Sequence, residues 1–295
     1  MSIHQKIRLT ISSVIILAGM TLQAQSPLPP VAEWKGKSEL LIVNANNPWI
    51  TPTEKSGFIT TPTYNETMDW LKKLSDASPL LTMTSIGKSL EGRNIMMIIA
   101  SSDKTITPAA LKNSPKPLLL VQAGIHAGEI DGKDAGMMLL RDIAFGSKKN
   151  LLNNVNLLFI PILNVDGHER SSPYNRPNQR GPENMGWRTN AENLNLNRDF
   201  AKQDTKEVRA VAGVFNDYDP LMYMDVHVTD GADYQYDITF GGHGKQGHSP
   251  AIMNWLETKY KPYADNDLAA NGHIPGQLLN ALNNQDFSNG SLNDL

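Results

Sequence analysis

The feature that most constrains the fold is a series of apolar runs of strand length that alternate with helix-like patterns. A strand buried on both faces is apolar throughout, whereas a strand with one face in water alternates apolar and polar residues. The runs lie at residues 81–86, 94–101, 117–124, 155–163, 220–228 and 234–240. Helical patterns lie at residues 64–77, 133–145 and 205–218. This alternation predicts an α/β fold with a mixed, largely parallel central sheet and helices on both faces.

Composition narrows the class of protein further. The chain has 295 residues, of which 40% are hydrophobic, so it can bury a sizeable core and is not mainly disordered. Its 27 basic and 30 acidic residues are nearly balanced, which argues against a nucleic-acid partner. There is no cysteine, which excludes a disulfide scaffold, a thiolate metal site and a cysteine nucleophile. Any bound metal must therefore use histidines and carboxylates.

The N-terminus has the pattern of a secretory signal peptide. Lys6 and Arg8 precede a mostly apolar stretch at residues 9–22, and Ala24 supplies a small residue for cleavage. The apolar stretch is shorter than the roughly 20 residues of a spanning helix, so we expect no membrane span after removal of residues 1–24. An exported chain without disulfides fits a bacterial periplasm or exterior.

The mature chain is expected to divide into a lead-in and a catalytic domain. Residues 25–58 are rich in proline and asparagine and predict an extended lead-in, with Trp34 and Trp49 as docking points. Residues 59–295 form the predicted domain. Within it, residues 171–198 make a polar connection far longer than usual, and such loops are commonly functional.

Two of the predicted strands end in residues suited to a metal. The run at 117–124 leads directly into His126 and Glu129, and the run at 220–228 contains His227 at its end. Ligands bind outside the carboxyl ends of strands in open α/β sheets, so these side chains should meet at one edge. Two histidines and a glutamate are a ligand set of catalytic zinc. Bound zinc supplies a nucleophile at neutral pH and polarises a carbonyl.

The alternative for this motif is a simple ion pair. His-x-x-Glu occurs often by chance, and at a protein surface its two side chains usually pair with each other. Two observations favour a metal site here: His126 and Glu129 follow an apolar strand with Gly124 and Gly128 beside them, and His227 follows a second strand.

Six ordered motifs give the chain a resemblance to a known family. GIHAGE at residues 124–129 resembles the zinc motif of the carboxypeptidase A-like metallocarboxypeptidases. Five further stretches resemble segments of that family in the same chain order: SIGKSLEGRNI (85–95), ILNVDGHER (162–170), GWRTN (186–190), NLNRDF (195–200) and MDVHVTDG (224–231). The resemblance covers residues 60–245 and implies one zinc ion held by His126, Glu129 and His227.

The resemblance also implies roles for three residues of the long polar connection. Asn197 and Arg198 would bind the free carboxylate of the substrate, and an Arg guanidinium suits a carboxylate because it can donate two parallel hydrogen bonds. Arg188 would stabilise the oxyanion that develops on the scissile carbonyl. The alternative for Arg188 is a structural arginine paired with a loop acid such as Glu183 or Glu192.

One part of the family's machinery has no assigned residue. Members use a late glutamate as general base and acid, and an amine leaving group needs a proton from such a residue. The one glutamate after His227 is Glu257. Its pattern predicts that it lies on the solvent face of a helix that begins after Ser249, so we assign it no catalytic role. The family's capping tyrosine is likewise unassigned. We expect either a sequence that is incomplete at its C-terminal end or a genuine pseudoenzyme.

Together these features predict a zinc-dependent metallocarboxypeptidase that acts on the C-terminus of a peptide or protein. Two alternatives stay open. One is a zinc-dependent N-acyl amino acid deacylase of the aspartoacylase and desuccinylase type, and the other is a zinc-containing peptide-binding protein without catalysis.

Two further features have simple structural interpretations. The stretch at residues 242–247 satisfies G-x-G-x-x-G, but it is a lone match and predicts a glycine-rich loop rather than a nucleotide site. We expect His168, in a turn, to face solvent or to hydrogen-bond within its loop.

Overall fold

The computed structural model of the chain describes residues 36–228, 236–241 and 249–277. The predicted signal peptide at 1–24, Trp34 and the glycine-rich stretch at 242–247 lie outside these residues. Among the helices that are described, none has the length and apolar composition needed to cross a bilayer.

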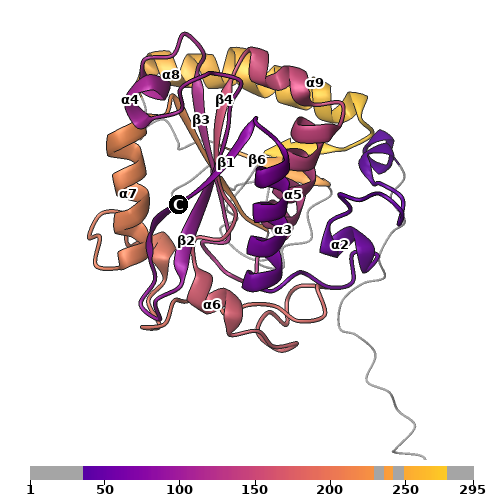
Figure 1. Cartoon of the computed structure of the whole chain (residues 1–295), viewed down its shortest axis with the longest axis vertical. Helices are drawn as coiled ribbons and strands as arrows, with labels where there is room; N and C mark the ends of the chain where they lie inside the picture. Colours follow the sequence, from indigo (N-terminus) through magenta and orange to yellow (C-terminus); the bar gives the residue numbers. More distant parts are fainter. Residues whose placement is uncertain (1–35, 229–235, 242–248, 278–295) are drawn as a thin grey trace, which may run out of the picture. The chain divides into compact units, whose positions relative to one another are not determined.

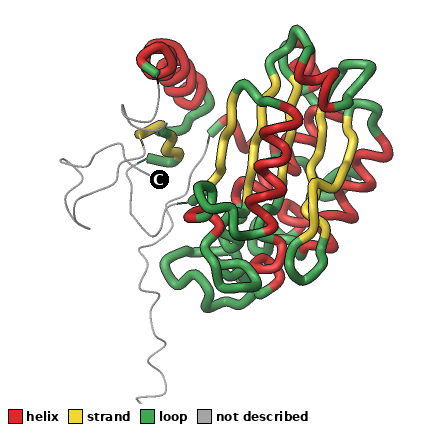
Figure 2. Tube along the Cα trace, turned by 90° about the vertical axis from the view of Figure 1, so that its left-hand side faces the viewer, coloured by secondary structure: helices red, strands yellow, loops and turns green. Residues whose placement is uncertain are grey.

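A five-stranded sheet in the order β1-β2-β4-β3-β5 carries the candidate site. Its strands are β1 (Leu81–Lys88), β2 (Asn94–Ala100), β3 (Leu118–Ala123), β4 (Asn156–Ile160) and β5 (Met222–Val226). Strand β3 pairs in parallel with both β4 and β5, whereas β2 pairs antiparallel with β1 and β4. Figure 2 shows these strands side by side. The sheet is therefore mixed with a parallel core, and the predicted fold class is confirmed.

Helices cover both faces of this sheet, as predicted. The longer ones are α3 (Tyr64–Ala77), α5 (Asp131–Phe145) and α7 (Lys206–Tyr218), and the shorter ones are α4 (Pro108–Lys112), η2 (Lys149–Asn153), α6 (Val165–Glu169) and η3 (Leu196–Arg198). Helices α3 and α5 lie on one side of the sheet and α7 on the other (Figure 1). Each side has its own core of buried apolar residues, with Leu71 and Met137 in one and Val208 and Val211 in the other.

The ends of helix α3 show how local sequence sets these elements. Thr63 caps the helix by accepting a hydrogen bond from the Glu66 amide, and the Glu66 carboxylate accepts one from the Thr63 amide in return. This capping box satisfies two amides that the first turn leaves without partners. Leu71 and Leu74 are fully buried on the face toward the sheet, in agreement with the predicted amphipathic pattern.

The described part of the predicted lead-in contains two short helices, η1 (Lys37–Leu41) and α2 (Pro52–Lys55), so it is not extended throughout. Trp49 stacks on Phe145 of α5 with ring centroids 4.6 Å apart, which confirms its predicted docking. Glu54 of α2 pairs with Arg141 of α5 at 2.6 Å, and both side chains are buried. This segment is therefore fastened to the domain by an aromatic stack and a buried ion pair.

The last described elements form their own small group. Strand β6 (Ile238–Phe240) pairs with β7 (Pro275–Gln277) in a separate two-stranded sheet. Between them lie α8 (Pro250–Trp255), the π-helical turn η4 (Leu256–Tyr260) and α9 (Lys261–Ala270). Of the predicted strand at 234–240, residues 236–240 are described, and three of these form β6 and pair outside the central sheet, so the predicted sheet is wrong. The predicted helix start is confirmed, since Ser249 accepts a hydrogen bond from the Ile252 amide.

Candidate metal centre

The register of two parallel strands brings the predicted metal ligands together. Ala123 at the end of β3 pairs with Val226 at the end of β5. His126 follows Ala123 by three residues and His227 follows Val226 directly, so both leave the sheet at the same edge. Gly124 turns the chain between strand and motif with φ +66°, a conformation that glycine adopts without strain. The predicted meeting of the two strand ends is confirmed.

His126, Glu129 and His227 form a cluster whose ligand atoms all lie within 4.8 Å of one another. Nδ1 of His126 lies 3.0 Å from Oε1 of Glu129, and Nδ1 of His227 lies 2.8 Å from Oε2 of the same carboxylate. His126 and Glu129 are buried, and His227 is partly exposed. Two imidazole nitrogens therefore face one carboxylate, and His227 is the most exposed of the three side chains.

Each histidine of the cluster has a partner on its other ring nitrogen. Asp225 Oδ2 lies 2.9 Å from Nε2 of His227, and Asn195 Oδ1 lies 3.3 Å from Nε2 of His126. Gln122 in turn donates to Asp225 at 3.1 Å. Metal-binding histidines almost always donate the second ring N–H to such an acceptor, which orients the ring and fixes the tautomer. With Nε2 acting as donor, Nδ1 of each ring is left to bind an ion.

Electrostatics keep the glutamate of the cluster anionic. Burial raises the pKa of Glu129, but the hydrogen bonds from His126 and His227 lower it by more, and the pKa lies well below its usual range. Burial lowers the pKa of His227, whereas its hydrogen bonds to Asp225 and Glu129 raise this pKa to about 10. A metal ion would take the place of that proton, because ligand histidines bind metals in their neutral form.

The donor set of this cluster fits zinc. Zinc in proteins is bound by histidine nitrogens and carboxylate oxygens, and three protein ligands leave a coordination position open for chemistry. Two nitrogens, one carboxylate and two outer hydrogen-bond acceptors meet these requirements. These three residues together could hold one ion.

Two arginines from the long loop reach the glutamate of the cluster. Arg188 Nη1 lies 3.5 Å from Oε1 of Glu129, and its side chain is partly exposed. Arg176 Nη2 lies 2.9 Å from the same oxygen and is 4% exposed. The long polar loop therefore brings positive charge to the cluster.

The two residues predicted to bind the substrate, Asn197 and Arg198, come shortly after Asn195 in the sequence, and Asn195 contacts His126. Asn197 is half-buried on η3, and its amide donates to Asn195 Oδ1 at 3.0 Å. Arg198 is exposed, and its guanidinium donates to the Asn197 carbonyl at 2.6 Å. Both therefore lie on a short turn that begins at a residue touching a predicted metal ligand.

Three residues of this site were missed from the sequence. Asn195 and Asp225 each stand two positions before a residue that was assigned, within the motifs NLNRDF and MDVHVTDG. In a strand, residues two apart point to the same face, so Asp225 could have been found from its spacing to His227. Arg176 lies in an irregular loop, where no periodicity indicates the direction of a side chain.

His168 is buried and hydrogen-bonds within its own segment. It is 6% exposed on α6, with Nε2 3.2 Å from Lys133 Nζ and Nδ1 2.9 Å from Glu169 Oε1. Lys133 is itself buried and also donates to the Pro62 carbonyl. Of the two expectations for His168, the hydrogen bond within its own segment is confirmed by Glu169, and the solvent-facing position is wrong because the side chain is buried beside Lys133.

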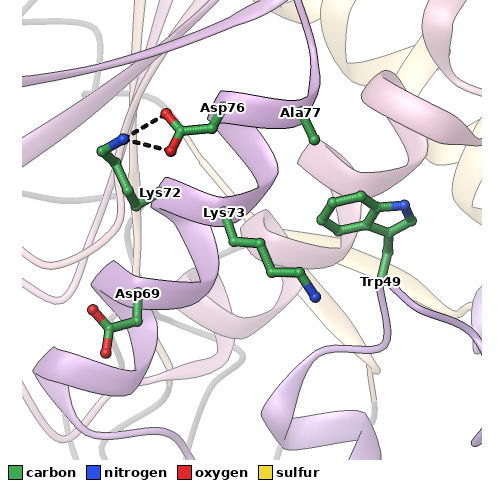
Figure 3. Close-up of a pocket in the computed structure, with 6 residues that line it drawn as sticks. All are labelled: Trp49, Asp69, Lys72, Lys73, Asp76 and Ala77. Atoms are coloured by element: carbon green, nitrogen blue, oxygen red, sulfur yellow. Dashed lines mark hydrogen bonds and ion pairs between the residues drawn. The ribbon is translucent and has the colours of Figure 1, made fainter.

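A surface pocket lies along α3, and its lining residues are distant in the sequence from those of the metal cluster. Its lining residues are Trp49, Asp69, Lys72, Lys73, Asp76 and Ala77 (Figure 3). Lys72 is paired with Asp76 at 2.5 Å, and Lys73 Nζ lies 5.0 Å from the Trp49 ring centroid. The pocket shares no residue with the metal cluster, and both of its lysines have partners within its own wall.

Comparison with known proteins defines the class of this chain. Residues 67–270 match the family described as Peptidase_M14, zinc carboxypeptidase, which is more than half of the chain. The chain belongs to the zinc carboxypeptidase family. This match supports the resemblance that the ordered motifs indicate.

Curated relatives match over part of their length. Carboxypeptidase Z of Gallus gallus is 30% identical over 171 residues, which is 54% of this chain and 25% of the relative. Carboxypeptidase 2 of Trichophyton rubrum is 28% identical over 172 residues, covering 56% of this chain and 28% of the relative. The matched region thus spans about a quarter of these relatives.

Solved structures agree on the fold. The metallo-carboxypeptidase from Burkholderia cenocepacia has a TM-score of 0.56 at 18% identity, covering 74% of this chain and 53% of that structure. Carboxypeptidase A from Helicoverpa armigera has a TM-score of 0.54 at 21% identity, covering 75% and 58% respectively. At these identities the likeness supports the fold alone.

Proposed function

We propose that this chain is a zinc-dependent metallocarboxypeptidase that hydrolyses the C-terminal peptide bond of peptides or proteins. The observation that carries the proposal is the cluster of His126, Glu129 and His227 at the edge where β3 and β5 end. Membership of the zinc carboxypeptidase family supports peptide hydrolysis over the hydrolysis of N-acyl amino acids.

His126, Glu129 and His227 would hold one zinc ion through two nitrogens and a carboxylate. Bound zinc supplies Lewis acidity toward a carbonyl and activation of water at neutral pH. Asp225 and Asn195 orient the two imidazoles for this task through their Nε2 atoms. The residues of the chain thus provide both the ligands and the groups that fix the ligands.

Arg188 is proposed to stabilise the negative charge that develops on the scissile carbonyl oxygen. Its guanidinium is partly exposed at the cluster, so it can donate to a substrate atom there. Removing one such donor from comparable sites costs about 2.7–4 kcal/mol of transition-state stabilisation. Asn197 and Arg198 are proposed to bind the terminal carboxylate, with the exposed guanidinium free to turn from the Asn197 carbonyl toward a substrate.

The proton that the leaving amine requires is not assigned to any residue of the described chain. Glu257, the one glutamate after His227 in the sequence, lies exposed on η4. Its position agrees with the solvent-facing helix that its sequence predicts. We therefore give it no catalytic role.

We also propose that the chain is exported, with a signal peptide cleaved after Ala24. The basic residues Lys6 and Arg8 and the apolar stretch at 9–22 support export to a bacterial periplasm or exterior. Intact mass measurement of the protein secreted by a bacterial host tests this proposal. A mature N-terminus at residue 25 is expected, and retention of the uncleaved chain in the cytoplasm would contradict it.

The substrate class can be tested with three small molecules. The zinc-loaded chain is mixed with an N-blocked dipeptide that has a free C-terminal carboxylate, with the amide of the same dipeptide and with an N-acetyl amino acid. Calorimetry measures binding, and chromatography measures the amino acid released. We expect binding and zinc-dependent hydrolysis of the free acid, and neither with the amide.

The variants sharpen this experiment. Arg198→Ala should weaken binding of the free acid about 10- to 100-fold, because a charge-assisted hydrogen bond is lost. Arg180→Ala, which removes an exposed arginine from the same long connection, is the matched control. Hydrolysis of the N-acetyl amino acid instead would indicate the deacylase. Binding of the free acid without turnover would indicate the non-catalytic peptide-binding protein. Equal binding and hydrolysis of the free acid and of the amide would contradict recognition of the terminal carboxylate.

A further inference from the structure

The long loop contacts the metal cluster from inside the protein through Arg176. This side chain is 4% exposed, and its Nη2 lies 2.9 Å from Oε1 of Glu129. The separation is shorter than the 3.5 Å of Arg188, which is the arginine with a predicted role in the reaction. Because Arg176 is buried, it is poorly placed to touch a substrate, and its position calls for another role.

Arg176 is itself held by a second residue of the loop. Its Nε donates to Oε1 of Gln179, and Nε2 of Gln179 donates to the Gly128 carbonyl at 3.1 Å. Gly128 directly precedes Glu129 in the zinc motif. The contacts therefore close a ring in which two loop residues grip two consecutive residues of the motif.

The close packing at Gly128 shows that this approach is built into the sequence. A Cβ atom at position 128 would lie 2.8 Å from Arg176 Cγ and 2.7 Å from the Gly186 carbonyl oxygen. Real Cβ atoms essentially never come this close to a neighbour. A glycine at this position lets the loop lie directly against the motif, with Arg176 packed on its backbone.

These contacts leave one oxygen of the Glu129 carboxylate facing His227, which follows β5. Oε1 of Glu129 is the oxygen that Arg176 contacts, whereas Oε2 faces Nδ1 of His227 and accepts the Val228 amide at 3.3 Å. A carboxylate has lone pairs enough to accept a guanidinium and still bind a metal. The planar guanidinium, held at its own Nε, thus limits rotation of the glutamate.

We propose that Arg176 is a positioning residue that fixes the Glu129 carboxylate for zinc binding, and that Gln179 holds Arg176 in place. This inference rests on the proposed metal site. Two effects of the guanidinium oppose each other, since its charge repels a cation while its hydrogen bond orders a ligand. Partners of metal ligands are typically worth 10- to 100-fold in metal affinity. The proposal is that the ordering effect is the larger one here.

Zinc affinity, measured by competition with a chromophoric chelator, tests the proposal. The proteins compared are the wild type, Arg176→Gln, Arg176→Lys and the control Arg180→Ala, which removes an exposed arginine from the same loop. We expect Arg176→Gln to bind zinc 10- to 100-fold more weakly, Arg176→Lys to recover part of the loss and Arg180→Ala to bind as the wild type does. Zinc binding by Arg176→Gln that equals or exceeds that of the wild type would overturn the proposal.

Gln179→Ala separates positioning from charge, because it keeps the guanidinium and removes its anchor. Gln179→Ala should also weaken zinc binding, and it tests the proposal even if Arg176→Gln fails to fold. An unchanged zinc affinity in Gln179→Ala would contradict the positioning role. The visible spectrum of the Co²⁺-substituted protein should shift in both variants, since the ligand field reports the carboxylate orientation. If the wild type itself binds no zinc, the proposed metal site is wrong. If the wild type binds zinc and the variants bind it equally well, the metal site stands and the positioning role of Arg176 is wrong.

Discussion

Asp225 Oδ2 lies 2.9 Å from Nε2 of His227, on the side of the imidazole opposite the nitrogen that faces Glu129. Asp225 lies near the end of β5 and His227 directly follows that strand, and Gln122 of the neighbouring strand donates to the same carboxyl group. A carboxylate in this position orients a metal-binding imidazole and raises its basicity. The end of β5 and the residue after it therefore supply both the group that orients the imidazole and the predicted ligand itself.

Removing Asp225 should weaken zinc binding without removing a ligand. We expect Asp225→Ala to bind zinc about 10- to 100-fold more weakly, which is the usual effect of losing such a partner. Competition with a chelator gives the affinity, and Asp217→Ala, an exposed aspartate of α7, is the matched control. Equal zinc affinity in Asp225→Ala and the control would show that His227 needs no outer partner.

The ion pair between Glu54 and Arg141 should stabilise the fold and not the metal site. The carboxylate lies 2.6 Å from the guanidinium, both side chains are buried, and Thr51 also donates to Glu54. Breaking a buried pair by removing one partner typically costs about 3–5 kcal/mol, because the other charge is left uncompensated. We expect Glu54→Ala to lower the free energy of unfolding by that amount in urea, with zinc stoichiometry unchanged in the folded protein.

The control for this loss is Asp76→Ala. It breaks the exposed ion pair with Lys72, which should be worth no more than about 1 kcal/mol. If both variants lose the same small amount of stability, the buried pair does not anchor α2 to α5.

Lys133 gives the stability of the protein a predicted pH dependence. Burial lowers the pKa of Lys133 from 10.5 to about 8, although the charge of Asp134 raises it in part. Between these two values the unfolded chain binds more protons than the folded chain, so the free energy of unfolding rises with pH. The contribution of this one residue should grow by up to about 3 kcal/mol across that interval.

Urea unfolding near pH 7.5 and near pH 10 measures this effect. The difference in unfolding free energy between the wild type and Lys133→Met should increase in favour of the wild type as the pH rises. Lys72→Met controls for the loss of one lysine at a solvent-exposed position. A difference that stays constant with pH would show that Lys133 titrates alike in the folded and unfolded chains.

The fold could be predicted from the sequence where burial dictates the pattern. Helix α3 begins and ends where its helical pattern at residues 64–77 predicts, and the five central strands follow the continuous apolar runs. Strand β6 was predicted too long and in the wrong sheet, because its residues are not fully buried and Ile238 is 37% exposed. An apolar run that does not enter a core gives no information on its pairing partner.

The candidate site divides in the same way. His126, Glu129 and His227 were predictable because parallel strands deliver their carboxyl ends to one edge. Arg176 was not, because the path of an irregular loop follows from packing against Gly128 and Gly186, which the sequence does not display. The burial of His168 was not predictable for a related reason, since it packs beside Lys133 of a helix distant in the sequence, whereas its local hydrogen bond to Glu169 was one of the two expectations.

The central claim is that one zinc ion binds at His126, Glu129 and His227. Elemental analysis of the purified, zinc-equilibrated and desalted chain tests it most directly, with His126→Ala and the control His273→Ala measured in parallel. His273 contacts Ser38 and belongs to no such cluster among the described residues. We predict one equivalent of zinc in the wild type and in His273→Ala and none in His126→Ala. A full equivalent of zinc in His126→Ala would contradict the site.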